Sequence, residues 1–204
     1  MRRRRFLAQS LAVCTAPVLP AHAEATGVPP GFIVPAEDSP HDATVMMWPA
    51  SRRVYPDRAF RTLLRRCITK IANSIAAFEP VILCADAALH STIRPRLTAG
   101  VTLWDIPTED LWARCAGPLI AQNQAGDRVL SHIQFNGWGR KQHHQNDKEV
   151  ARAVARRLGF AIHDSGLVGE PGGADQDGHG TVIAHESSWV IDNRNPDLSR
   201  DQIA

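Results

Sequence analysis

Apolar side chains recur every three to four residues between positions 56 and 78, and this spacing predicts the longest helix of the chain. Asp57 lies in its first turn, where a carboxylate interacts favourably with the helix dipole. A second helix is predicted over 147–158, ended by Gly159 as its C-cap, and a weaker one over 87–97, interrupted by Pro95. The apolar stripe of the first helix is Phe60, Leu63, Leu64, Cys67, Ile68, Ile71 and Ile75.

Short apolar runs between these helices predict β-strands. The expected strands are 44–48, 80–85, 101–106, 119–122, 129–135, 160–163, 181–184 and 188–191. Strands that alternate with helices are typical of an α/β fold, so we predict that fold class. The buried positions in these patterns include two cysteines, Cys67 and Cys84, which we interpret as small core residues.

Two segments without apolar periodicity frame the pattern. Residues 24–42 are rich in Pro and Gly and are interpreted as an extended entry segment, and residues 107–118 form a polar, turn-rich segment. Near the end, Ser199 followed by Gln202 resembles a capping box, which predicts that a helix begins there. We therefore expect 24–204 to be an incomplete domain whose next helix is only starting.

The extreme N-terminus is predicted to be an export signal. Residues 1–23 contain Arg2 to Arg5, then a modestly apolar stretch and an Ala21-His22-Ala23 cleavage site. The Arg3-Arg4-x-Phe6-Leu7 pattern fits the twin-arginine form, which predicts a periplasmic or secreted protein. A basic arm that stays attached, or a lipid anchor at Cys14, are the alternatives.

Charge and composition exclude two classes of partner. The formal net charge is +2, but four of the positive charges belong to the signal, so the remainder is mildly acidic. A mildly acidic body argues against nucleic-acid binding. No apolar run reaches the roughly 18 residues of a membrane span, and we expect no membrane association once the signal is removed.

Few of the usual chemical motifs are found. Three widely spaced cysteines in the mature chain are not a disulfide framework, and no His/Cys set has zinc spacing. His143 and His144 are interpreted as surface residues. Polar residues are dense in 109–118 and 169–181. Taken alone, the first could be a turn with an Arg–Asp pair, the second a calcium loop or anion-binding nest, and both could be plain loops.

Six ordered blocks resemble the N-terminal half of the agmatine deiminase and bacterial (Porphyromonas-type) peptidylarginine deiminase family. The first three are Pro35-Ala36-Glu37 with Pro40-His41, Ala43-Thr44 and Trp48-Pro49, then Phe78-Glu79-Pro80-Val81, and then Asp110-x-Trp112-x-Arg114-x-x-Gly117-Pro118. The others are Phe135-Asn136-x-Trp138-Gly139, Glu170-x-Gly172 with Asp177-Gly178-x-Gly180-Thr181, and Asn193-Arg194-Asn195-Pro196 with Leu198-Ser199-Arg200.

This resemblance implies a fold and a reaction. The family's fold is a five-bladed α/β propeller, the pentein fold, with the active site on the central axis. Its members hydrolyse a guanidine to a ureido group and ammonia: carboxylates hold the planar guanidinium, a Cys thiolate attacks its carbon, and a His transfers protons. No cofactor or metal is implied. The expected substrate is agmatine, converted to N-carbamoylputrescine for putrescine and polyamine synthesis, or alternatively peptidyl-arginine.

Site roles follow from the motif positions. Glu170 falls on the family's acidic catalytic position, although a Glu that caps a turn is the alternative. Asp110 is expected to line the same pocket or to form a turn, and Trp112 to wall the pocket or to lie in the core. Arg114 and Trp138 are expected to be supports, and Asp177 to shape the Gly-rich turn.

The sequence also departs from the family pattern. Cys115 stands where the family has an Asp that binds the guanidinium, so a charge-assisted hydrogen bond is missing. Asp38 and Val45 replace aromatic residues, and Pro171 interrupts a Glu-Gly-Gly segment. The family's Gly-His-x-Asp motif and nucleophilic Cys are not found in the 204 residues. A non-catalytic half-propeller is therefore the rival interpretation, and we expect an oligomer or a complementary C-terminal half as partner.

Overall fold

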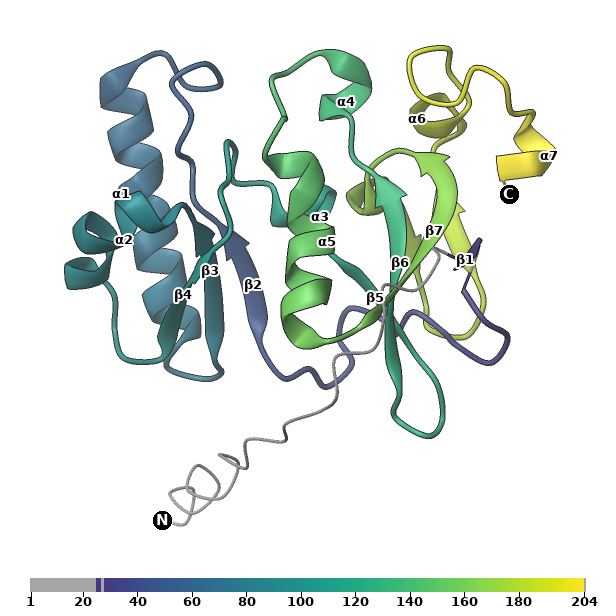
Figure 1. Ribbon diagram of the computed structural model, residues 1–204, viewed down its shortest axis with the longest axis horizontal. Helices are drawn as coiled ribbons and strands as arrows, with labels where there is room; N and C mark the ends of the chain where they lie inside the picture. The colour runs from purple at the N-terminus through teal and green to yellow at the C-terminus, as the bar shows by residue number, and fades with distance from the viewer. Residues whose placement is uncertain (1–24, 27, 204) are drawn as a thin grey trace.

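The computed structural model describes residues 25–26 and 28–203, so the predicted export signal at 1–23 lies outside the described residues. Two sheets stand side by side with a helix between them, and a small hairpin lies beyond the second sheet (Figure 1). This arrangement confirms the predicted α/β class. Among the described residues, no helix is both long enough and apolar enough to cross a membrane.

The first sheet is parallel, with strand order β2-β3-β4. Its strands are β2 (Thr44–Met47), β3 (Val81–Ala85) and β4 (Val101–Asp105). One face packs against α1 (Arg58–Ile75), α2 (Ala87–Ile93) and the 3₁₀ turn η1 (Arg94–Arg96). Asp57 is the N-cap of α1 and not part of its first turn as predicted, and its carboxylate accepts the backbone N–H groups of Ala59 and Phe60.

The second sheet has strand order β1-β7-β6-β5. Its strands are β1 (Ala25–Thr26), β5 (Leu119–Gln122), β6 (Arg128–Gln134) and β7 (Ala161–Val168). β6 runs parallel to β7 and antiparallel to β5. The register between β6 and β7 shifts after His132, where Gly166 has φ +73° and the Ser165 hydroxyl donates to the His132 carbonyl. This irregularity sets the direction in which β7 leads into residue 170.

The helix α5 (Asp147–Leu158) lies between the two sheets and is buried on two sides. We call each sheet with the segments that follow its strands a unit. Val150 and Val154 pack with Met47, Cys84 and Ile106 of the first unit. Ala151 and Ala155 pack with Leu130 of the second sheet. Gly159 ends α5 in the left-handed conformation (φ +74°), which confirms the predicted C-cap.

The C-terminal part is built from short elements. The 3₁₀ turn η2 (Pro171–Gly173) leads into the antiparallel hairpin of β8 (Ala174–Gln176) and β9 (Val182–Ala184). The helices α6 (Glu186–Trp189) and α7 (Arg200–Ile203) follow. Ser199 precedes α7 and its N–H donates to the Gln202 side chain at 2.9 Å, which confirms the predicted helix start.

Two predictions were wrong, and the predicted stripe of α1 is only partly covered. Residues 188–191 are not a strand, because α6 and the turn after it occupy that region. Cys67 is exposed rather than in the core, whereas Cys84 is buried as predicted. The stripe of α1 is not buried as one surface, since Phe60, Leu63 and Ile71 are 49%, 52% and 47% exposed.

Candidate functional site

The loop that follows β4 is anchored to the start of α5 by backbone hydrogen bonds. The Asp147 carboxylate accepts the N–H of Glu109 at 2.7 Å and the N–H of Asp110 at 3.1 Å. Asp147 is 1% exposed, and this burial raises its pKa to about 7. Glu109 reciprocates: its carboxylate accepts the Asn146 N–H at 3.2 Å and pairs with His143 at 2.9 Å. The loop and the helix therefore fix each other.

Asp110 is buried, and its carboxylate is already engaged by groups of the chain. It accepts hydrogen bonds from the Tyr55 hydroxyl, from Gln142 Nε2 at 2.6 Å and from the N–H of Leu111 at 2.7 Å. Burial and the Asp110 carboxylate together raise the pKa of Tyr55 far above its usual range, so the phenol stays a donor. Asp110 thus organises the loop and offers few free lone pairs to a ligand.

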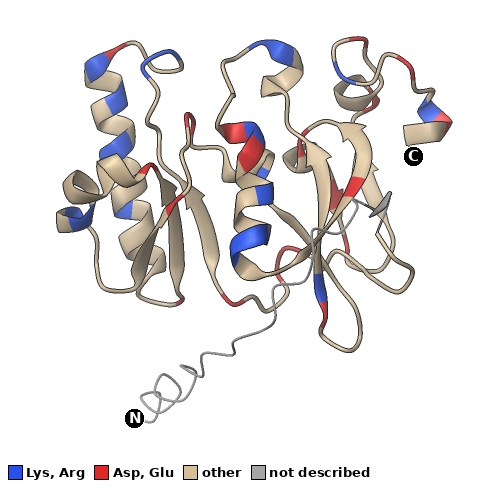
Figure 2. Cartoon of the chain, in the orientation of Figure 1, with Lys and Arg blue, Asp and Glu red and all other residues tan. Residues whose placement is uncertain are grey.

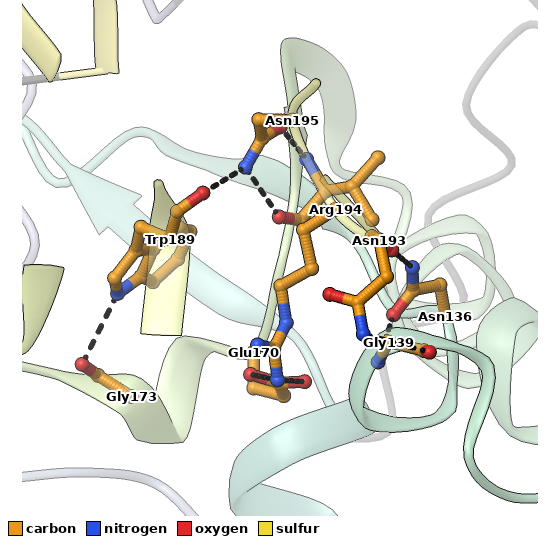
Figure 3. Close-up of polar contacts among 9 residues, drawn as sticks. Asn136, Gly139, Glu170, Gly173, Trp189, Asn193, Arg194 and Asn195 are labelled. Carbon is orange, nitrogen blue, oxygen red and sulfur yellow. Dashed lines mark hydrogen bonds and ion pairs between the residues drawn. The ribbon is translucent and has the colours of Figure 1, made fainter. Parts of the chain in front are cut away.

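Glu170 follows β7 and is 4% exposed. Its two carboxylate oxygens accept hydrogen bonds from one nitrogen of Arg194, Nη2, at 2.7 and 3.0 Å (Figure 3). The side chains of Arg194 and Glu170 are 9% and 6% exposed, so this is a buried ion pair. Because Arg194 engages Glu170 through a single nitrogen, the carboxylate retains lone pairs for a second donor.

The residues on either side of Arg194 fix the backbone that carries it. Asn195 donates to the carbonyls of Val168 and Trp189, both at 2.9 Å, and accepts the N–H of Val168. Asn193 donates to the Gly139 carbonyl at 3.2 Å, and its own carbonyl accepts from Asn136 at 2.9 Å (Figure 3). The end of β7 and the turn after β6 are therefore linked through 193–195.

The turn after β6 has an unusual backbone. In α4 (Gly137–Arg140), four consecutive residues have positive φ, including Trp138 (φ +57°) and Arg140 (φ +64°). Non-glycine residues seldom adopt this conformation, and such strain persists only where the surroundings fix it. Gly139 is required here, because a Cβ would lie 2.3 Å from the Asn193 amide. The strain places the Trp138 ring edge-on to Phe135, with centroids 5.0 Å apart.

Cys115 lies in the short helix α3 (Ala113–Ala116), between this tryptophan and the backbone of η2. A Cβ on Gly172 would lie 3.1 Å from the Cys115 sulfur, so a side chain at this position would push the two segments apart by a few tenths of an ångström. Burial raises the pKa of the Cys115 thiol, the Trp138 hydrogen bond lowers it, and the negative charges of Glu170 and Asp110 raise it. The thiol is therefore neutral at physiological pH.

The remaining predicted residues lie around this centre. Trp112 is 54% exposed, which rules out the core position considered for it. Arg114 pairs with Glu37 at 2.6 Å and donates to the Ala174 carbonyl at 3.1 Å. Asp177 accepts the backbone N–H groups of His179 and Thr181, and the Thr181 and His179 hydrogen bonds lower its pKa to about 2.

The structure thus brings Cys115, Trp138 and Glu170 into one neighbourhood, with Asp110 close by on the loop that carries α3. Sequence reasoning did not find the partners Arg194, Asp147, Tyr55 and Gln142. The Asn193-Arg194-Asn195-Pro196 run was visible, but nothing local indicates that its Arg pairs with a Glu 24 positions earlier. Among residues 25–26 and 28–203, no group of three or more His, Cys, Asp or Glu could hold a metal ion.

Comparison with known proteins identifies the family of this chain. Residues 33–204 match the Porphyromonas-type peptidyl-arginine deiminase family, and the chain belongs to it. Among curated relatives, the agmatine deiminase of Ectopseudomonas mendocina (strain ymp) is 36% identical over 182 residues, which are 85% of this chain and 48% of that protein. The chain spans about half the length of the curated relatives it matches.

Solved structures show the same relationship. A structure described as agmatine deiminase of Enterococcus faecalis catalysing its reaction superposes with a TM-score of 0.80 and 26% identity, over 89% of this chain and 52% of that one. A C. jejuni C315S agmatine deiminase with substrate bound gives a TM-score of 0.74 at 18% identity, over 84% and 51% of the two chains. The second likeness is evidence for the fold alone.

Proposed function

We propose that this chain forms part of a guanidine deiminase that converts agmatine and water to N-carbamoylputrescine and ammonia. We also propose that its two α/β units are blades of a five-bladed propeller, the pentein fold. Family membership and the agmatine deiminase relatives support both proposals. The His-x-Asp and nucleophilic Cys of the family's chemistry would come from a segment that complements this chain.

The observation that carries the proposal is the position of Glu170. It is a buried carboxylate beside the electrically neutral thiol of Cys115, and Arg194 balances its charge. A carboxylate in such a water-poor place forms strong charge-assisted hydrogen bonds with a planar cation. We assign Glu170 to guanidinium binding and proton transfer, Asp110 and Cys115 to the lining, and Trp112 to an outer wall. Arg114, Trp138 and Asp177 would support the loops.

A chimera tests this assignment. Residues 24–204 are fused to the C-terminal half of the E. mendocina relative, and ammonia release from agmatine is measured. The 204-residue chain alone should release no more than a heat-treated control, whereas the chimera should turn over. Glu170→Gln in the chimera should lower kcat/KM by about 100-fold or more.

Glu149→Gln is the matched control, because Glu149 is an exposed carboxylate on α5. It should leave turnover unchanged. A folded, active chimera whose rate does not respond to Glu170→Gln would refute the assigned role. Ammonia release by the 204-residue chain alone would refute the need for a complementing segment.

Peptidyl-arginine is the second candidate substrate. Two observations favour it: the family that matches is described as a peptidyl-arginine deiminase family, and the N-terminus resembles an export signal. The same chimera can be given agmatine, free arginine and an arginine-containing peptide. Faster ammonia release from the peptide than from agmatine would make citrullination the main activity.

Export is a separate proposal, which rests on Arg3-Arg4-x-Phe6-Leu7 and the Ala21-His22-Ala23 site. A folded reporter fused to residues 1–30 should reach the periplasm or the medium. Replacement of Arg3 and Arg4 by Lys should keep it in the cytoplasm. A reporter that stays cytoplasmic behind the unaltered signal would show that the segment is not an export signal.

A further inference from the structure

The helix α1 has three sides of different character. Ile68 lies on the side that is buried against the first sheet. The apolar stripe that includes Leu63 and Ile71 lies on a second side, which a neighbouring blade of the proposed propeller would cover. Because an α-helix has about 3.6 residues per turn, positions 66 and 70 fall on a third side. Arg66 and Lys70 occupy it, and both are exposed.

The helix α5 shows that a third side of this kind stays open when the other two are covered. Ala151 packs with the second sheet, and Val150 packs with the first unit. Arg156 lies on the remaining side and is exposed. A blade that covers the stripe of α1 would therefore leave the side of Arg66 and Lys70 in contact with solvent.

A polar groove of about 640 Å³ lies between this third side of α1 and the turn η1. Only polar and basic side chains line it, among them Arg66, Lys70 and Arg96. Asn73 fixes the wall that η1 forms: its side chain donates to the Arg96 carbonyl at 2.9 Å and accepts the Thr98 N–H at 2.9 Å. The backbone that carries Arg96 is therefore held against α1.

No acidic residue of the described part of the chain neutralises these three side chains. Among residues 25–26 and 28–203, Arg66, Lys70 and Arg96 form no ion pair. The carboxylates of Asp57 and Asp86 accept the backbone N–H groups at the starts of α1 and α2. The groove therefore carries an uncompensated positive charge.

The positive charge of this region also affects a neighbouring side chain. Burial lowers the pKa of Arg65, and the charges of Arg61, Arg52 and Arg96 lower it further. Two cations of the groove are four residues apart on α1, where like charges destabilise a helix. Figure 2 shows the basic residues along α1 and at η1. The fold thus gathers positive charge at a cost in stability, which a ligand of opposite charge would remove.

We propose that this groove is a binding site for a phosphate group, carried either by a soluble phosphorylated compound or by a lipid headgroup. Three cations without a counter-ion are balanced best by a ligand with more than one negative charge. A phosphate monoester carries about −1.5 to −2 at neutral pH. The planar guanidinium groups of Arg66 and Arg96 match pairs of phosphate oxygens, and Lys70 adds a compact charge. This inference does not depend on the proposed catalytic function.

Isothermal titration calorimetry with inorganic pyrophosphate tests the proposal on the 204-residue chain. Pyrophosphate should bind at low ionic strength, and added salt should weaken the binding. Arg66→Gln and Arg96→Gln should each raise the dissociation constant about tenfold or more. Arg156→Gln is the matched control, because it removes the same charge from the exposed side of α5. It should change the dissociation constant by less than about twofold.

Vesicles identify the source of the phosphate. If the chain sediments with vesicles that contain phosphatidylglycerol, but not with phosphatidylcholine alone, and pyrophosphate releases it, the phosphate belongs to a lipid. If pyrophosphate binds and the chain does not sediment, the phosphate belongs to a soluble compound. Circular dichroism establishes that each variant is folded. Absence of binding to both probes would refute the proposal. Equal losses in Arg96→Gln and Arg156→Gln would also refute it, because the overall charge of the chain would then explain the attraction.

Discussion

The two sheets of this protein are stabilised in different ways. The first has helices on both faces, α1 and α2 on one and α5 on the other, and its buried side chains are almost all apolar. The second has α5 on one face only, while its other face borders an open groove. Apolar burial stabilises the first sheet.

Polar contacts hold the end of the second sheet in place. Asn195 links β7 to α6, and Arg194 and Glu170 form a buried ion pair beside them. The predicted site residues Trp138, Glu170 and Asp177 follow its strands, whereas the others lie on the segment that joins the two sheets. A binding site requires buried polar groups and an open side, and the end of the second sheet provides both. The comparison shows that a sheet covered by helices on both faces leaves no opening for a ligand, whereas a sheet with one open face does.

The largest expected effect comes from the helix that the two units share. Val154 on α5 is fully buried among side chains of the first unit. Val154→Glu places an unpaired charge there, and the free energy of unfolding should fall by about 5 kcal/mol or more. Leu158→Glu, on the same helix at an exposed position, should change it by less than about 1 kcal/mol. Urea unfolding followed by circular dichroism measures both, and equal losses would mean that α5 is not a common core.

The next effect sharpens the contrast between polar and apolar stabilisation. Arg194→Met leaves Glu170 as a buried charge without its partner, which should lower the free energy of unfolding by about 3–5 kcal/mol. The control is Arg128→Met: Arg128 pairs with Asp42, but their side chains are 40% and 75% exposed. Its loss should stay below about 1 kcal/mol. If Arg194→Met is as mild as Arg128→Met in denaturant titrations, the second unit does not depend on its ion pair.

The smallest effect concerns the contact between the loop at 109–110 and α5. Asp147→Asn retains one acceptor oxygen instead of two, so one backbone N–H bond is lost, and the free energy of unfolding should fall by about 1–2 kcal/mol.

The sign of its pH dependence follows from burial. Burial raises the pKa of Asp147 from 3.8 to about 7, so the folded protein binds this proton more tightly than the unfolded chain does. The stability that this carboxyl contributes therefore decreases as pH rises from 3.8 to about 7. The amide of the Asp147→Asn variant does not titrate. The loss caused by the substitution should be larger near about pH 5 than near about pH 8. The exposed Asp175→Asn is the control, and a loss that grows with pH would contradict the buried carboxyl.

Much of the fold could be predicted because local patterns determine it. The strands at 81–85 and 119–122, the helix at 147–158 and its Gly159 cap were found where periodicity and capping are strong. Whether an apolar helix face is covered by a sheet could not be predicted in this way. A stripe such as Phe60 to Ile71 shows that a helix has an apolar face, but not whether a sheet lies against it. The same limit explains why Cys67 is exposed. Trp189 lies in a helical turn instead of the predicted strand, and its indole donates to the Gly173 carbonyl, a contact that local periodicity does not indicate.

The site was predictable only as far as short motifs reach. The motifs that resemble the family identified three site residues, Glu170, Cys115 and Trp138, and the structure brings them together. Their partners belong to segments far away in sequence, such as Arg194 for Glu170 and Tyr55 for Asp110. Hydrogen bonds between distant segments are set by the folded backbone, and no spacing rule in the sequence indicates them.

The central claim is that Cys115 occupies a place where a carboxylate would bind the guanidinium, and the chimera with the E. mendocina C-terminal half tests it most directly. The measurement is kcat/KM for agmatine in three forms: unaltered, Cys115→Asp and Cys115→Ser. The neutral thiol and the neutral hydroxyl should behave alike. The carboxylate should add a charge-assisted hydrogen bond of about 2–3 kcal/mol, which corresponds to roughly 30- to 150-fold faster turnover. If the Cys115→Asp chimera folds and is no faster than the other two, Cys115 does not face the guanidinium and the proposed site is wrong.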